Sequence, residues 1–487
     1  MSPISLHNGV KESQGQRMDA ENKAPVYLEG ATSPKGSTQD EGVRPPHDPL
    51  SWPKWKRNTQ ILMIAVHSMV STFMAAGIVP AYDTFAEMYG VSVHTVTYLT
   101  STQILLLGIA PFVWKPLTTR FGRYHICVLS VLGSFLCNIG GARCTTFGTQ
   151  MATRVITAWF ISPPIAIGSG VVTELCSKDE RAQKIGWWTL LTTIGVPAGP
   201  FIMGFVVQHI GVEWVFWLFA IINFCQFVAY ILFGKETLYP RDLEGNLEPP
   251  KAPSFPRSIF PHRIDPRPVT ATDFISPMFL CRFPRILVPS LAYAITFAYA
   301  NIVIVVEMPT AFGKKFNFNA QQIGYQFVAI IIGCVLGEQI SGRMSDSFIR
   351  LLKRRRGHAA PADRLWLSYI GFATVFAGLL TWGFQLQNAT TWNVTPCVGA
   401  AIASFGNQIL TTTLITFAVD SHKEVSTDIG MFVNICRQIY GFTGPFYLPL
   451  MFERFGLGGA AGIFCAIVAG SALVPIIAIQ FVATRKP

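Results

Sequence analysis

Long apolar stretches separated by short polar segments extend from residue 59 to residue 482. A helix of about 20 mostly apolar residues crosses the hydrocarbon core of a bilayer, and twelve stretches reach this length. Six precede a polar segment, 235–285, and six follow it, so the pattern predicts an all-α membrane protein of two six-helix halves. The predicted spans are 59–82, 94–115, 124–142, 149–173, 186–206, 213–234, 286–308, 322–341, 366–385, 396–419, 429–451 and 459–482.

The polar segments define the domain organisation. Residues 1–58 are predicted to be a disordered tail, because they are polar and rich in Gly, Pro and Ser. The first half covers 59–234, a linker covers 235–285, and the second half with a short tail covers 286–487. Much of the linker is proline-rich, which excludes a long helix, although a short interfacial helix is expected around 271–283.

The two halves resemble each other weakly. The segment "GVPAGPF" (195–201) in the fifth span is similar to "GFTGPF" (441–446) in the eleventh, the fifth span of the second half. Repeated six-span halves are typical of secondary transporters, whose substrates bind near the midplane between the halves.

Composition and charge support a membrane protein and orient it. The chain is 50% hydrophobic and 13% charged, about half the charged share of a soluble protein. Of 38 Lys and Arg, four lie in the expected outer loops, two lie within spans, and 32 lie in the other segments. By the positive-inside rule both termini and the linker are predicted to be cytoplasmic. Two glycosylation acceptors, Asn388 and Asn393, fall in one outer loop.

The net charge of +11 does not indicate a nucleic-acid partner, because the basic residues flank apolar spans. The ten cysteines are scattered singly and form no CxxC pair, so neither a metal site nor a disulfide framework is predicted. The chain contains no HExxH, no GxSxG and no phosphate-binding glycine loop. We therefore expect no cofactor and no enzymatic activity.

The fifth predicted span, "GWWTLLTTIGVPAGPFIMGF" (186–205), is unusually rich in Gly and Pro. Gly195 and Gly199 share one helix face and allow another helix to approach closely, while Pro197 and Pro200 bend the helix. Such a helix suits either a seam between two moving halves or a static packing face, and the spacing alone does not choose between them.

This stretch resembles the fifth-span signature G-x8-G-x3-G-P-x2-G-G of twelve-span drug/proton antiporters in the major facilitator superfamily. The residues that match are Gly186, Gly195, Gly199, Pro200 and Gly204, and Met203 replaces one glycine. The resemblance implies a major facilitator fold with twelve transmembrane helices, and a bent helix at the seam that limits leak.

Other segments extend this resemblance. "KPLTTRFGRY" (115–124) is similar to the family loop G-x-L-a-D-R-x-G-R-R, and the matching residues are Leu117, Arg120, Gly122 and Arg123. Thr119 replaces the family Asp, which argues against a gating ion pair in this loop. "TRVITAWF" resembles the family R-x-x-Q-G pattern and keeps its arginine, Arg154. Segments 234–241, 330–346 and 417–446 resemble a fungal branch related to histidinol and polyamine carriers.

Ionisable residues within spans are costly and are candidates for function. Arg154 is either a proton-coupling partner or anion ligand, or an interfacial arginine. Glu338 is either a protonatable carboxylate or a partner of nearby Arg343. Glu307 either binds a cation or gates the outer mouth, or is interfacial.

The eleventh span contains Asn434 and Arg437, which either bind an anionic or hydrogen-bonding substrate or are part of a site neutralised by Asp420 or Asp428. His67 is either a proton-handling group or an interhelical hydrogen-bond donor. Gln103 is a candidate cavity hydrogen bonder, together with Tyr293, Asn301, Asn407 and Gln408.

The sequence as a whole favours a proton-coupled antiporter that exports a small organic molecule by alternating access. The substrate class left open is a secondary metabolite, a drug-like toxin or an organic acid. The alternative is a proton-coupled importer of a small amine or other nutrient with the same fold. The expected partners are the substrate, protons and the bilayer, and the expected state is a monomer in the plasma membrane.

Overall fold

The computed structural model describes residues 48–176, 178–238, 270–357, 360–422 and 425–485. These residues belong to one compact unit, Val43–Pro487. The predicted tail up to residue 47 and most of the predicted linker, 239–269, lie outside the described residues. Within the described ranges every regular element is a helix, and the predicted all-α fold is confirmed.

The helices of the first half follow the predicted spans. They are η2 (Pro49–Ser51), α1 (Lys54–Ala76), η3 (Val79–Ala81), α2 (Tyr82–Tyr89), α3 (Val93–Phe121), α4 (Arg123–Gly141), α5 (Phe147–Ile161), α6 (Pro163–Leu175), α7 (Lys178–His209) and α8 (Glu213–Phe233). The fourth span is divided into α5 and α6 at Ser162, because Pro163 and Pro164 lack the amide donors that a continuous helix requires.

The second half has the same order of long helices. Its elements are α9 (Ala271–Ile275), η5 (Ser276–Arg282), α10 (Pro284–Phe297), η6 (Ala298–Ile302), α11 (Val303–Phe316), α12 (Ala320–Arg356), η7 (Pro361–Leu367), α13 (Ser368–Asn388), α14 (Thr395–Ser421), α15 (Ser426–Val468), η9 (Ala469–Leu473) and α16 (Val474–Arg485). The segment in which we expect a short interfacial helix, 271–283, contains α9 and η5.

The number of spans depends on the last long helix. Eleven stretches of the described chain are long and apolar enough to cross a membrane, and the last, Thr427–Val482, has 56 residues. At 1.5 Å per residue it would be about 84 Å long, far more than one crossing needs. Gly456 interrupts it with φ 69° and ψ 172°, a conformation that glycine adopts at little cost. Divided there, the stretch supplies two spans, and the total becomes the predicted twelve.

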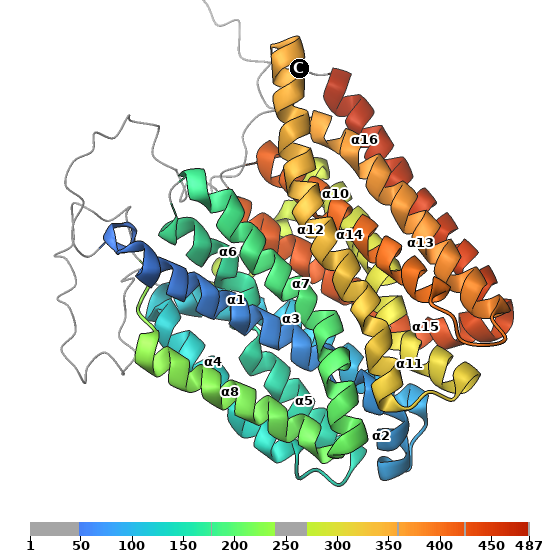
Figure 1. The fold of residues 1–487 in the computed structure, drawn as a ribbon. Coiled ribbons are helices and arrows are strands. Elements are labelled where there is room, and N and C mark those ends of the chain that lie inside the picture. Colours follow the sequence, from blue (N-terminus) through green and yellow to red (C-terminus); the bar gives the residue numbers. More distant parts are fainter. Residues whose placement is uncertain (1–47, 177, 239–269, 358–359, 423–424, 486–487) are drawn as a thin grey trace, which may run out of the picture. The chain divides into compact units, whose positions relative to one another are not determined.

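The helices of Val43–Pro487 form two groups, α1–α8 in blue to green and α10–α16 in yellow to red (Figure 1). Helix α3 packs against α15, and α7 packs against α12, so two helix pairs join the groups. We call the end of the bundle where α3 and α12 finish, with residues 115–123 and 343–356, the basic end. At the opposite end His94 Nε2 lies 2.8 Å from the carbonyl oxygen of Pro445.

Candidate functional site

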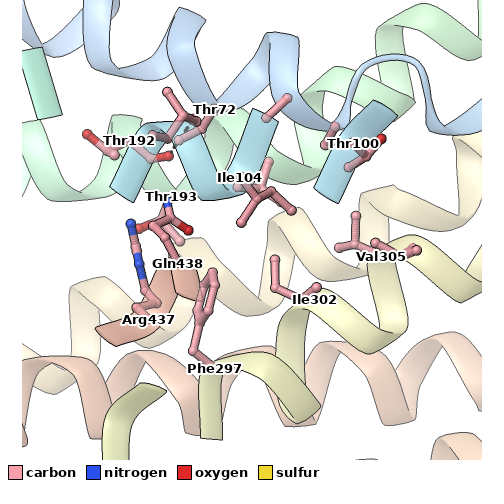
Figure 2. A pocket seen from close by; sticks show the side chains of 15 residues that line it. Thr72, Thr100, Ile104, Thr192, Thr193, Phe297, Ile302, Val305, Arg437 and Gln438 are labelled. Atoms are coloured by element: carbon pink, nitrogen blue, oxygen red, sulfur yellow. Dashed lines mark hydrogen bonds between the residues drawn. The ribbon is translucent and has the colours of Figure 1, made fainter. Parts of the chain in front are cut away.

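A small cavity lies between the two groups of helices. Its first-half wall comes from α1, α3 and α7, and its second-half wall comes from α10, η6, α11 and α15. Figure 2 shows Thr72, Thr100 and Thr192 along one wall, with Phe297 and Arg437 along the other. The volume is about 30 Å³, which is room for about one or two water molecules.

The guanidinium of Arg437 lines this cavity and is held in a fixed orientation. It donates to the hydroxyl of Tyr293 at 3.4 Å and to Oδ1 of Asn434 at 3.0 Å. Its central carbon lies 4.7 Å from the ring centroid of Phe297. Asn434 also donates to the carbonyl of Leu107 in α3 at 3.1 Å, which ties the site to the first half.

The structure contradicts the alternative in which Asp420 or Asp428 neutralises Arg437. Asp428 pairs with Lys115, and Asp420 accepts a hydrogen bond from Arg364 at 2.9 Å. Among the described residues, Arg437 has no carboxylate partner.

Arg154 lies in the protein interior rather than at an interface. Its side chain is 1% exposed, and it donates to the carbonyls of Met74 at 2.9 Å and Ala75 at 3.1 Å. These carbonyls belong to the last turn of α1, where a helix has no amide partners of its own and where the helix dipole favours a cation. Ala75 also lines the cavity, so Arg154 holds one of its walls. The interfacial alternative is wrong.

The two carboxylates within the spans have different surroundings. Glu307 is 6% exposed and forms no hydrogen bond or ion pair within the described ranges, so its side chain lies within the protein rather than on its surface. Glu338 is partly buried and accepts a hydrogen bond from Gln408 Nε2 at 3.1 Å. Its described partner is therefore an amide of α14 rather than Arg343. Neither carboxylate lines the cavity.

Tyr82 connects these charges to the cavity and was missed in the sequence. Its hydroxyl donates to Thr100 Oγ1 at 2.7 Å, and Thr100 lines the cavity. The same tyrosine lies within electrostatic range of both Arg154 and Glu307. A tyrosine at the end of the first predicted span, followed directly by Asp83, was the available signal.

His67 is fully buried within the first half and does not line the cavity. Its Nδ1 lies 3.1 Å from the hydroxyl of Tyr230, and its Nε2 lies 3.3 Å from Ser130 Oγ. Because both ring nitrogens have partners, the residue links α1, α4 and α8, which favours the interhelical alternative.

Gln103 is also fully buried, and both of its amide atoms have no partner among the described residues. The same is true of both amide atoms of Asn301 and Asn407. None of these three residues lines the cavity, so the structure does not bring them into the site.

The glycines of α7 face three different environments. A Cβ atom on Gly199 would lie 2.5 Å from the carbonyl oxygen of Phe73 in α1, and Gly195 faces the same helix. A Cβ on Gly204 would lie 2.5 Å from the carbonyl oxygen of Ala320 and 3.1 Å from Cα of Gly324, both in α12 of the second half. Gly186 has no such neighbour within 4 Å. Gly195 and Gly199 thus let α7 pack closely on α1 of its own half, and Gly204 lets it pack closely on α12 of the other half.

Comparison with known proteins identifies the fold family. Residues 64–445 match the Major Facilitator Superfamily. The chain belongs to this superfamily. Among its relatives are the MFS-type transporter atr4 of Stereocaulon alpinum, 25% identical over 89% of this chain and 79% of the relative, and the efflux pump radE of Floropilus chiversii, 25% identical over 91% of this chain and 85% of the relative.

A solved structure agrees with this assignment. The human organic anion transporter MFSD10 (TETRAN) has a TM-score of 0.59 at 15% identity, covering 88% of this chain and 99% of its own. At this identity the likeness concerns the fold alone. The chain is thus a multi-pass membrane transporter with the major facilitator fold, as predicted.

The family loop at the basic end is held by two carboxylates. Both terminal nitrogens of Arg123 donate to Glu174, at 2.7 and 2.5 Å. Glu236 accepts from the backbone amides of Arg123 and Tyr124 at 3.0 and 3.1 Å, which satisfies free amides at the start of α4. Gly122 has φ 85° between α3 and α4.

The same loop forms an ion pair that the sequence did not predict. Lys115, which stands where the family pattern has Gly, contacts Asp428 in the first turn of α15, so the pair joins the two halves. The absence of the family Asp therefore does not leave this loop without an ion pair to the second half. The positive charge comes from Lys115, and the family motif has glycine at this position, so the motif did not indicate a charged side chain there.

We expect this pair to help close the basic end of the transporter. Both side chains are 23% exposed, so the coupling should be about 1 kcal/mol, the upper range for surface pairs. Lys115→Met and Asp428→Asn should each slow transport, and the double variant should be no slower than the worse single one. Initial transport rates of the four proteins in vesicles measure this. Additive losses would show that the two residues act independently.

Proposed function

We propose that this transporter is a proton-driven antiporter that exports a small organic molecule from the cytoplasm. The observation that carries the proposal is the position of the cavity between the two six-helix halves, with walls from both. Its volume of about 30 Å³ admits no organic molecule. In the proposed cycle a substrate enters between the halves when they separate at one end, as in alternating access.

Three further observations support the direction and the coupling. The glycine spacing of α7 resembles the antiporter signature, and relatives such as radE are named efflux pumps. The buried carboxylate of Glu307 is a group that could exchange a proton as the cavity changes face. The basic end is placed in the cytoplasm by the positive-inside rule.

The remaining features of the proposal concern topology. Asn388 and Asn393 are exposed at the end opposite the basic end, as glycosylated residues outside the cell would be. A functional monomer in the plasma membrane completes the proposal.

The test is gradient-driven uptake into inverted plasma-membrane vesicles, with a panel of fluorescent organic dyes as probes. An exporter accumulates dye only while the vesicle interior is acidic, and a protonophore abolishes the accumulation. Uptake into right-side-out vesicles alone would indicate an importer, and equilibration without a gradient would indicate a channel.

Vesicle orientation is checked with a single cysteine at Thr391, an exposed residue next to the two acceptor asparagines. The exposed native thiols, Cys225 and Cys281, are first replaced by serine. A membrane-impermeant maleimide should label the new cysteine from outside intact cells. Protection of this site would overturn the proposed topology.

A further inference from the structure

The cavity between the halves is positively charged. Fifteen residues line it, and apart from Arg437 they are threonines, one glutamine and apolar residues. Arg437 is thus the one ionisable side chain among these lining residues. None of the fifteen described lining residues is Asp or Glu, so the described walls offer no carboxylate to a cationic substrate.

The charge of Arg437 is not balanced by the protein. Its described contacts are neutral groups, namely Tyr293, Asn434 and the ring of Phe297. Its Nε atom is buried and has no hydrogen-bond partner among the described residues. The side chain as a whole is partly exposed. A charge within a membrane span that has no opposite charge beside it is costly, and the cost falls when an anion binds there.

The surroundings of Arg437 also limit the shape of that anion. A guanidinium has five N–H donors, and only two of its contacts in this structure are hydrogen bonds. The free donors of a planar guanidinium match the two oxygens of a carboxylate. The walls beyond are largely apolar and include Ile104, Ile302 and Val305, which suits an apolar body attached to the charged end.

We infer that the transported molecule is an organic anion with one carboxylate on an apolar body, and that its carboxylate binds Arg437 against the face of Phe297. This inference rests on the proposed export function and names its substrate class. Phe297 fixes the plane of the guanidinium, and Asn434 and Tyr293 fix its rotation. With its orientation fixed by these three residues, Arg437 determines the charge specificity of the site.

The test uses purified wild-type transporter and a panel of aromatic carboxylic acids, each paired with its methyl ester. Binding is measured by quenching of tryptophan fluorescence. We expect the acids to bind more tightly than their esters, and Arg437→Gln to weaken acid binding about tenfold or more without changing ester binding. Arg437→Lys keeps the positive charge but lacks the planar set of N–H donors that binds both carboxylate oxygens, so it should give intermediate affinity for the acids.

Arg454→Gln is the matched control, because this arginine is exposed at the end opposite the basic end and lies outside the cavity lining. It should bind the acids as the wild type does. Tighter binding of the esters, equal binding of acids by Arg437→Gln, or absence of acid binding would each overturn the inference.

The same acids then separate this inference from the proposed function. Acid binding that depends on Arg437 but no gradient-driven uptake into inverted vesicles would reject proton-driven export and keep the anion site. Gradient-driven uptake of amines or esters in place of the acids would keep export and reject the anion site.

Discussion

Gly204→Leu is expected to slow transport by roughly five- to a hundredfold, while the amount of protein in the membrane stays near that of the wild type. The added side chain would meet the backbone of α12, where a Cβ already lies 2.5 Å from the carbonyl oxygen of Ala320. Overpacking of this kind costs about 1–3 kcal/mol, and each 1.4 kcal/mol is about a factor of ten. Because the clash lies between the halves, it should oppose their closure rather than the folding of either half.

Two other glycines of α7 serve as matched comparisons. Gly186→Leu places the same side chain where no neighbour lies within 4 Å and should transport normally. Gly199→Leu would clash with Phe73 and Gly77 within the first half, and should lower the amount of folded protein as well as transport. Amounts are measured by fluorescence-detected gel filtration, and rates by vesicle uptake. If all three variants transported alike, close packing of α7 would not matter for the cycle.

The positions of the membrane spans were the most predictable part of the fold. The spans could be located from the sequence because a bilayer requires long apolar stretches, and the helices follow them closely. The glycine spacing likewise indicated a helix that packs closely on others. The break at Gly456 was also foreseeable, since a polar segment separates the eleventh and twelfth spans.

The partners of the candidate residues were not predictable, because they lie on helices far apart in the sequence. Lys115 and Asp428 are 313 positions apart, and the sequence suggested Asp428 only as a partner of Arg437. Arg154 binds backbone carbonyls, which every residue has and which no sequence pattern marks. Most of the cavity wall is made of residues with no distinctive sequence pattern, such as Thr72, Thr192 and Phe297. They line the cavity only because of the way in which the two halves pack together.

The structure favours Glu307 over Glu338 as the proton carrier. It therefore predicts different results when each of these residues is replaced by glutamine. Proton coupling requires a group that is stable without charge in one state and charged in another. Glu307 meets this requirement, because it is 6% exposed and forms no hydrogen bond or ion pair among the described residues. Its charged form is therefore costly here, although Lys314 lies within electrostatic range. Its neighbour in the chain, Val306, lines the cavity, although Glu307 itself does not.

Glu338 is the matched carboxylate in the same half. It already accepts a hydrogen bond from Gln408, and a glutamine in its place can keep that contact. We therefore expect Glu338→Gln to slow transport by no more than about fivefold, the value of one net hydrogen bond of about 1 kcal/mol. From the sequence, Glu338 and not Glu307 was the candidate protonatable carboxylate.

Glu307→Gln should instead abolish accumulation driven by a pH gradient, by at least about tenfold, because a protonation change at a costly buried site drives the cycle. Exchange of labelled for unlabelled substrate across vesicles without a gradient should continue, since the cavity and Arg437 are untouched. Uptake is measured against the imposed pH difference for both variants, with exchange measured in the same vesicles. Gradient-driven uptake that survives in Glu307→Gln but disappears in Glu338→Gln would assign the proton to Glu338. Survival in both variants would place it on a group outside these two carboxylates.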